Sequence, residues 1–376
     1  MQWVKAAWQK AKSLLARETD FDLRDMNFLS NKQPENCRWD LVSLGEVLLR
    51  FDPENERIHT ARSFRVFDGG AEYNVARGLA KVLRRRTAIV TALANNSLGR
   101  LAEDFVLQAG VDASEIVWRN DGADTRNGIY FIERGFGLRA PTSCFDRANT
   151  AVSQLKTGEI NWREIFNQNG TRWFHTGGVF VGLSETTPEV AKEAMRVARA
   201  NGAIVSFDLN YRDSLWKNKG GREAANAVNR ELLPFADVVF GAMDFDARLS
   251  QFNAEQFQHA AGKMLSEFAN LKIVCSTLRE VHSASRHDLS AVCFANGAVF
   301  KAKNYENIDV LDRVGSGDAF ASGLIYGLLA EKDFQFAVEC GAAHACLAMT
   351  APGDNSVSTL AEIENLMQGA GGDVNR

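Results

Sequence analysis

The segment DRVGSGDAFASGLIYGLL, residues 312–329, combines the local signals from which the fold can be inferred. A short apolar stretch, NIDVL (307–311), precedes it, two glycines flank a serine, and a long apolar run follows Asp318. Glycine permits a sharp turn and lets a ligand approach the backbone closely. The segment therefore predicts a strand, a tight turn and a buried helix near 316–330 that begins at the turn.

The start of this helix is suited to an anion. Its first N–H groups have no partner inside the helix and its dipole is positive there, which favours a phosphate or the charge that develops in phosphoryl transfer. Asp318 is itself negative, so it belongs beside a phosphate only if it takes a proton from an attacking hydroxyl group. The alternative is an acid that merely stabilises the first turn of a helix. The dinucleotide fingerprint is excluded because Phe320 replaces its third glycine, and a Walker loop because no GK[ST] follows.

The rest of the chain after Trp39 alternates short apolar runs with helical patterns. The run DLVSLGEVLLRF (40–51) is apolar enough for a buried strand, and TAIVTAL (87–93) and later runs are similar. Such runs predict buried strands in a mostly parallel sheet that helices cover on both faces. In AVCFANGAVFKAK (291–303), Asn296-Gly297 between two apolar arms predicts a β-hairpin.

Two regions break this alternation, at 50–70 and 125–151. Both are rich in β-branched and aromatic residues and are punctuated by glycine and proline, so neither predicts a helix. We interpret them as a small separate β-layer built from two insertions, with lid segments at about 50–68 and 125–151. A layer of this kind could close over a site.

Composition narrows the class of protein. The 376 residues suggest one large domain with an elaboration. Lys and Arg number 43 against 47 Asp and Glu, a net charge of −4, which lacks the basic excess typical of nucleic-acid binding. No apolar run is long enough to span a bilayer. The six cysteines show neither a CxxC pair nor zinc spacing, and we expect free thiols in the cytoplasm.

The two ends differ from the remainder. Val4, Trp8, Ala11 and Leu15 share one helical face, so residues 1–38 are predicted to form a helical extension that packs on this chain or on a neighbouring subunit. A transit peptide and a membrane-surface helix are the alternatives. Residues 366–376 are expected to form a C-terminal tail.

Two further polar clusters follow the same strand-to-helix logic. Gly69 and Gly70 precede a helix that carries Asn74 in its first turn, where a polyol could lie against the backbone. In VSFDLNYRDSLW (205–216), the polar residues follow a strand, at the edge where ligands of parallel sheets collect. Arg212 could there pair with a carboxylate or phosphate. The alternatives are a plain glycine turn and a loop of solvated charges.

Together, GGAEYNVA (69–76), DLNYRDSLW (208–216) and the segment 312–329 resemble the PfkB, or ribokinase-like, carbohydrate kinases, from about Asp40 to about Ser358. Within that family the chain is most similar to 2-keto-3-deoxygluconate kinases, in NGIYFIERG, FDRANTA, FHTGGV and APGD. The resemblance implies a ribokinase-like three-layer α/β/α domain over 39–365 with a small β-sheet lid. It also implies ATP-dependent phosphorylation of a primary hydroxyl of a sugar acid.

The resemblance also implies site residues. Asp318 is the base, and the backbone N–H groups of Gly315, Ser316 and Gly317 form the anion hole. The substrate residues are Gly69, Gly70, Asn74, Tyr130 and Arg212, with Arg139 and Arg147 as weaker lid candidates; the nucleotide residues are Thr277, Asp244 and Gly353. ATP with Mg²⁺ is the implied donor, a monovalent cation near Asp312 and the APGD loop is a family habit, and the lid is expected to join a homodimer or higher homo-oligomer.

Several positions depart from the family pattern. Ala242 stands where relatives often carry an asparagine, so Asp244 or Asp246 would have to supply the acid of that region. Arg279 stands in a glycine's place, and Ile132 where a sugar-contacting arginine is common. A non-catalytic regulatory or assembly protein therefore stays open, as does a fructokinase-like kinase. Arg212 favours an acidic sugar, because a neutral sugar offers nothing for a guanidinium to pair with.

Overall fold

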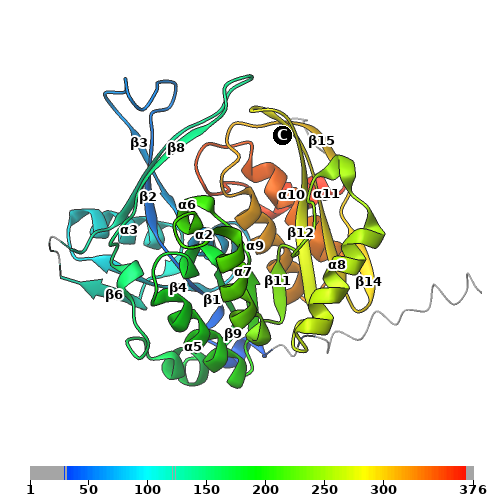
Figure 1. Ribbon diagram of the computed structural model, residues 1–376, viewed down its shortest axis with the longest axis horizontal. Helices are drawn as coiled ribbons and strands as arrows, with labels where there is room; N and C mark the ends of the chain where they lie inside the picture. Colours follow the sequence, from blue (N-terminus) through cyan, green and yellow to red (C-terminus); the bar gives the residue numbers. More distant parts are fainter. Residues whose placement is uncertain (1–28, 30–31, 121, 123, 370–376) are drawn as a thin grey trace, which may run out of the picture.

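The computed structural model describes residues 29, 32–120, 122 and 124–369, which form a large sheet between two layers of helices and a smaller sheet that projects from one edge (Figure 1). Most of the predicted extension 1–38 and the last residues of the predicted tail lie outside the described residues. Residues 366 and 367 belong to the final helix.

The strands are β1 (Trp39–Leu44), β2 (Leu48–Asp52), β3 (Arg65–Gly69), β4 (Thr87–Ala94), β5 (Val111–Asp112), β6 (Ile116–Arg119), β7 (Gly128–Glu133), β8 (Thr142–Asp146), β9 (Thr171–Gly177), β10 (Ile204–Asp208), β11 (Val238–Phe240), β12 (Ile273–Ser283), β13 (Arg286–Ala295), β14 (Ala298–Lys301) and β15 (Tyr305–Asp309). The α-helices are α2 (Ala71–Arg77), α3 (Ser97–Gln108), α4 (Gly178–Val181), α5 (Thr187–Ala200), α6 (Asp213–Trp216), α7 (Gly221–Leu232), α8 (Ala254–Glu267), α9 (Ser316–Leu329), α10 (Phe334–Ala348) and α11 (Leu360–Met367). Short 3-10 or π segments occur at Pro34–Asn36, Gly78–Val82, Val152–Gln154, Glu164–Gln168, Leu233–Phe235 and Leu249–Gln251.

The large sheet confirms the predicted parallel architecture. Its strands follow the order β14-β13-β12-β11-β10-β9-β1-β4-β5, with β6 beside β4 and β15 beside β13. All neighbours from β12 through β5 are parallel, and the pairs that β13 makes are antiparallel. The predicted hairpin lies at this antiparallel edge, where Asn296 and Gly297 both have positive φ and join β13 to β14.

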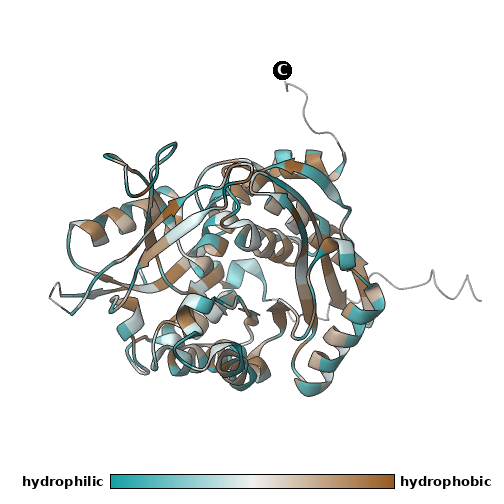
Figure 2. Ribbon diagram, turned by 45° about the horizontal axis from the view of Figure 1, so that its top comes forward, coloured by the Kyte–Doolittle hydropathy of each residue, from teal (hydrophilic) through white to brown (hydrophobic). Residues whose placement is uncertain are grey.

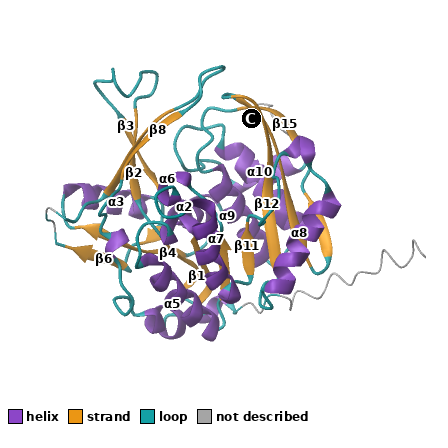
Figure 3. Cartoon of the chain, viewed as in Figure 1, coloured by secondary structure: helices purple, strands orange, loops and turns teal. Residues whose placement is uncertain are grey.

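Alternate residues of the central strands enter two separate cores, one on each face of the sheet. Leu41 and Ile89 pack with α2, α3, α9, α10 and α11, whereas Val42 and Val90 pack with α5, α7 and α8. Figure 2 shows the apolar residues concentrated in the sheet and in the helices against it, and Figure 3 shows the helices flanking the strands. No helix among the described residues is long and apolar enough to cross a membrane.

The small sheet has the order β3-β2-β7-β8 and unites the two predicted lid segments. One expectation was wrong in detail. The run 40–51 is not one strand but two, because the chain leaves the large sheet after β1 and enters the small sheet as β2. The break falls at Gly45, where a Cβ atom would overlap the side chain of Glu72, so the chain can pass only with glycine there.

Candidate active site

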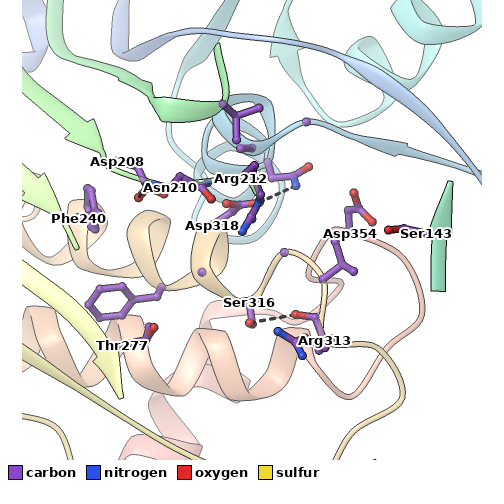
Figure 4. Close-up of a pocket in the computed structure, with 18 of the residues that line it drawn as sticks. Ser143, Asp208, Asn210, Arg212, Phe240, Thr277, Arg313, Ser316, Asp318 and Asp354 are labelled. Carbon is purple, nitrogen blue, oxygen red and sulfur yellow. Dashed lines mark hydrogen bonds between the residues drawn. The ribbon is translucent and has the colours of Figure 1, made fainter. Parts of the chain in front are cut away.

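Most of the predicted site residues gather in one cavity of about 800 Å³ between the carboxyl ends of the parallel strands and the small sheet (Figure 4). Those that line it are Gly70, Asn74, Tyr130, Arg212, Thr277, Gly315, Ser316, Gly317 and Asp318. Gly69, Asp244 and Gly353 do not line it. The three motifs that are far apart in sequence therefore meet in space.

Asp318 lies in the first turn of α9 and faces α2. The Nδ2 atom of Asn74 donates a hydrogen bond of 2.7 Å to its Oδ2 atom, and Asp318 is 9% exposed. Burial raises the pKa of Asp318 to about 7; the Asn74 hydrogen bond opposes this shift and the charge of Asp208 adds to it. A carboxylate that exchanges its proton near neutral pH suits a general base.

The turn before α9 is held by the loop that carries Asp354. Gly315 has a φ of +76°, and a Cβ atom there would overlap the backbone oxygen of Asp354. The first N–H groups of α9 lack helical partners and stand at the cavity wall. Ser316 donates its hydroxyl proton to the backbone oxygen of Arg313 at 3.1 Å (Figure 4) and accepts a hydrogen bond from Nη2 of Arg279. The turn thus has the geometry of an anion-binding site.

Other side chains that line the cavity are suited to a polar, anionic substrate. Arg212 lies beside Asp208, whose pKa burial raises to about 6 while Arg212 opposes the shift. Tyr130 of β7 is buried, stacks on Phe145 and donates its hydroxyl proton to Asp354. Arg147 also lines the cavity, with its Nη1 atom 3.3 Å from Oε2 of Glu46.

Several candidates lie outside the cavity. Arg139 sits at the tip of the small sheet, where its backbone pairs with Phe136. Gly69 ends β3, and Gly353 donates its N–H group to Oδ2 of Asp312 at 3.3 Å. Asp244 is exposed and its carboxylate lies 3.5 Å from Lys263.

The acids of the GAMDFD segment therefore do not reach the cavity. Asp246, like Asp244, is exposed and pairs with its neighbour Arg248. Within the described residues, no group of three or more His, Cys, Asp and Glu side chains could hold a metal ion.

A cluster of charges that the sequence reasoning missed supports the turn from behind. Arg50 of β2 is fully buried and forms ion pairs with Asp52, Asp312 and Asp354. Burial alone would lower the pKa of Arg50, but the carboxylates of Asp354 and Asp312 raise it. The available signal was a lone arginine within the apolar run LLRF. Beside Asp312 the guanidinium of Arg50 already joins the carboxylates of Asp312 and Asp354, and a monovalent cation near them stays a prediction.

Two buried glutamates were also missed. Glu72 accepts a hydrogen bond of 3.0 Å from the backbone N–H of Phe180, and burial raises its pKa to about 8. Burial raises the pKa of Glu46 to about 7, against the opposing charge of Arg147. No pattern in the sequence distinguished these acids from solvated ones.

Comparisons with known proteins agree with this geometry. The model for "pfkB family carbohydrate kinase" matches residues 39–360. A 2-dehydro-3-deoxygalactonokinase of Haloferax volcanii is 31% identical over 338 residues, which cover 90% of this chain and 99% of the relative. The crystal structure of 2-dehydro-3-deoxygluconokinase from Thermotoga maritima has a TM-score of 0.79 and 36% identity, covering 87% of this chain and 99% of that one. A putative ribokinase II of E. coli, solved with ATP and Mg²⁺, shares the fold at a TM-score of 0.71 and 19% identity, covering 88% and 99%.

Proposed function

The chain belongs to the pfkB family of carbohydrate kinases, and we propose that it phosphorylates a primary hydroxyl group of 2-keto-3-deoxygluconate with ATP. The family membership favours the carbohydrate kinase over the regulatory alternative raised by the altered motifs. The names of the two relatives above 30% identity support a keto-deoxy sugar acid as the substrate.

The observation that carries the proposal is that Asp318 and the anion-binding turn Gly315–Gly317 line one cavity together with Asn74 and Arg212, which come from distant parts of the chain. Asp318 takes the proton of the sugar hydroxyl while its oxygen forms a bond to the terminal phosphorus of ATP. The bond from that phosphorus to the bridging oxygen breaks, and ADP leaves. The N–H groups of Gly315, Ser316 and Gly317 stabilise the charge on the transferring group, and Asn74 keeps the carboxylate oriented.

Magnesium fits the donor set of the cavity. Mg²⁺ prefers oxygen ligands and is usually bound by one or two carboxylates together with substrate phosphates. Asp208 supplies a carboxylate at the cavity wall that would hold the ion together with the phosphates. When bound, the ion neutralises phosphate charge; the orientation of the sugar and the movement of its proton are the work of the chain's own residues.

A substrate panel tests the proposal. ADP release is measured with 2-keto-3-deoxygluconate, its C4 epimer 2-keto-3-deoxygalactonate, fructose, ribose and adenosine. We expect kcat/KM for one of the two acids to exceed that for every neutral compound by at least about a hundredfold, since a guanidinium–carboxylate contact contributes several kcal/mol. A higher kcat/KM for the C4 epimer would make 2-keto-3-deoxygalactonate the substrate in place of 2-keto-3-deoxygluconate. A neutral sugar whose kcat/KM lies within tenfold of that of the better acid would contradict the proposal of an acidic substrate.

Arg212 provides the matched variant for this panel. Arg212→Gln should lower kcat/KM for the acid by about ten- to a hundredfold and leave the slow reaction with fructose nearly unchanged. An equal loss with both sugars would mean that Arg212 does not recognise the carboxylate.

We further propose that the small sheet is the lid and joins two subunits. Phe136, Leu138 and Phe145 are exposed on it, and every residue of β8 is exposed. Light scattering should give twice the chain mass, and a monomer would contradict this arrangement. The use of ATP and the six free cysteines support a cytoplasmic location.

A further inference from the structure

Arg279 is the position at which this chain departs most visibly from the glycine expected beside the nucleotide, and it lies at the cavity wall next to the anion-binding turn. It stands on β12, and its Nη2 atom bonds to the hydroxyl of Ser316. Its Nε atom is buried and has no hydrogen-bond partner. No carboxylate of the described residues lies within 4.0 Å of its guanidinium. The guanidinium therefore lines the cavity without an acid among the described residues to neutralise its charge.

The charges around Arg279 are of the same sign as its own. Burial, with the neighbouring charges of Arg313 and Arg212, lowers the pKa of Arg279 to about 10. A partly desolvated cation is unfavourable unless an anion and hydrogen bonds compensate it. Since the chain supplies no such acid here, an anion that enters the cavity would satisfy both the charge and the unused donors.

We propose that Arg279 is a catalytic residue that binds the phosphoryl group while it passes from ATP to the substrate. The inference rests on the proposed kinase reaction and deepens it. The contact with Ser316 puts the guanidinium beside the N–H groups that receive this phosphoryl group, so side-chain and backbone donors converge on the same oxygens. A planar guanidinium suits this position because its fork of donors matches two phosphate oxygens.

Two other roles are physically reasonable. Arg279 could be a strut that only holds Ser316 and the first turn of α9, or it could fill the phosphate position and slow the reaction. The three roles differ in how nucleotide binding and turnover respond when the side chain is shortened, so one set of variants separates them.

The variants are Arg279→Ala, Arg279→Lys and Arg279→Gly, with Arg230→Ala as the control. Arg230 is an exposed arginine of α7 that pairs with Glu267 and does not line the cavity. Thermal unfolding establishes that each variant is folded. Calorimetry without sugar measures the affinity for ADP and for a non-hydrolysable ATP analogue that retains the terminal phosphate.

We expect Arg279→Ala to weaken binding of the ATP analogue about tenfold and of ADP less than threefold, because only the analogue carries the terminal phosphate. With the best sugar, kcat should fall about a hundredfold or more. Arg279→Lys should retain part of the affinity, and added guanidinium at low concentration should restore part of the turnover of Arg279→Gly. The Arg230→Ala control should match the unaltered protein.

Three results would overturn the assignment. Equal losses for ADP and the ATP analogue would place Arg279 away from the terminal phosphate. A fall in thermal stability without any nucleotide effect would make it a strut, and a higher kcat in Arg279→Ala would make it an obstacle. If no sugar acid is phosphorylated, the proposed substrate fails, but the sugar-free nucleotide comparison still decides the role of Arg279.

Discussion

Arg50 and Arg279 contact the two ends of the same turn, yet their surroundings are opposite. Arg50 joins Asp312 and Asp354 behind the turn and has three carboxylate partners, whereas Arg279 contacts Ser316 at the cavity and has no carboxylate partner among the described residues. The carboxylates raise the pKa of Arg50, and burial with like charges lowers that of Arg279. The same residue type thus serves structure on one side and, in our proposal, phosphate binding on the other.

The two arginines divide the support of the turn from the binding of a ligand. The charge of Arg50 is paired with carboxylates on both sides of the turn, which ties Asp312 to the Asp354 loop that packs against Gly315. The donors in front of it are left for a ligand. A rigid support beneath an open donor set is the arrangement that electrostatic catalysis requires, because donors that are already oriented cost no reorganisation during the reaction.

The largest expected effect is on kcat, and it comes from Asp318, which lies on the side of the turn that faces the cavity. Asp318→Asn should lower kcat by about a thousandfold or more, since a general base contributes about 10²- to 10⁴-fold. Nucleotide affinity should change little. Steady-state kinetics and calorimetry measure the two quantities, and near-normal turnover of the variant would show that another group takes the proton.

The raised pKa of Asp318 predicts how both activity and stability depend on pH. Its pKa in the folded protein is about 7, so kcat/KM should rise as pH increases through 7 and the carboxylate forms. Because this pKa is raised, the folded state binds its proton more tightly than the unfolded state between about pH 4 and 7, and stability from this residue falls as pH rises through that window. Asp318→Asn should therefore be the more stable protein at pH 8, by on the order of 1–4 kcal/mol, and the difference should shrink at pH 5. Urea unfolding at the two pH values checks this sign.

The second largest effect is on stability, and it comes from the Arg50 ion-pair cluster on the other side of the turn. Arg50→Met should lower the free energy of unfolding by about 3–5 kcal/mol, because it leaves Asp312 and Asp354 buried without a cation, while Asp52 keeps its ion pair with Arg134 at 3.2 Å. Adding Asp354→Asn should restore part of the loss by removing one of the unpaired charges. Chemical denaturation compares the two variants. A loss below about 1 kcal/mol for Arg50→Met would mean that the cluster is not what stabilises the turn.

This contrast also explains what the sequence could predict. The apolar runs, the glycines and the helix starts are local signals, so the sheet, the hairpin and α9 follow from them, and the helix expected near 316–330 is observed at Ser316–Leu329. The partners of Arg50 come from residues 52, 312 and 354, and no local pattern connects them. Whether an arginine is paired or open depends on side chains that only the folded chain brings together.

A smaller effect on stability and on the sugar KM is expected for Tyr130, where the small sheet contacts the Asp354 loop. Tyr130 lines the cavity and bonds to Asp354, so it links the small sheet to the loop that holds Gly315. Tyr130→Phe should cost about 1 kcal/mol of stability and raise the sugar KM several-fold, while the ATP KM stays within twofold. Equal changes in both KM values would indicate that the hydroxyl acts through the turn rather than on the sugar side. Unfolding and two-substrate kinetics provide the measurements.

The smallest effect is expected for Asp244, whose sequence position favoured a nucleotide role. Its side chain is 72% exposed, outside the cavity wall, and opposite Lys263 at 3.5 Å, and exposed pairs of this kind contribute about 0–1 kcal/mol. Asp244→Asn is the suitable change, because the residue has a φ of +58° and asparagine tolerates that conformation. The ATP KM and kcat should both stay within twofold. A tenfold rise in the ATP KM would instead show that Asp244 acts in the nucleotide site. Its negative charge would then counteract the positive charge that Arg279 offers to the phosphates.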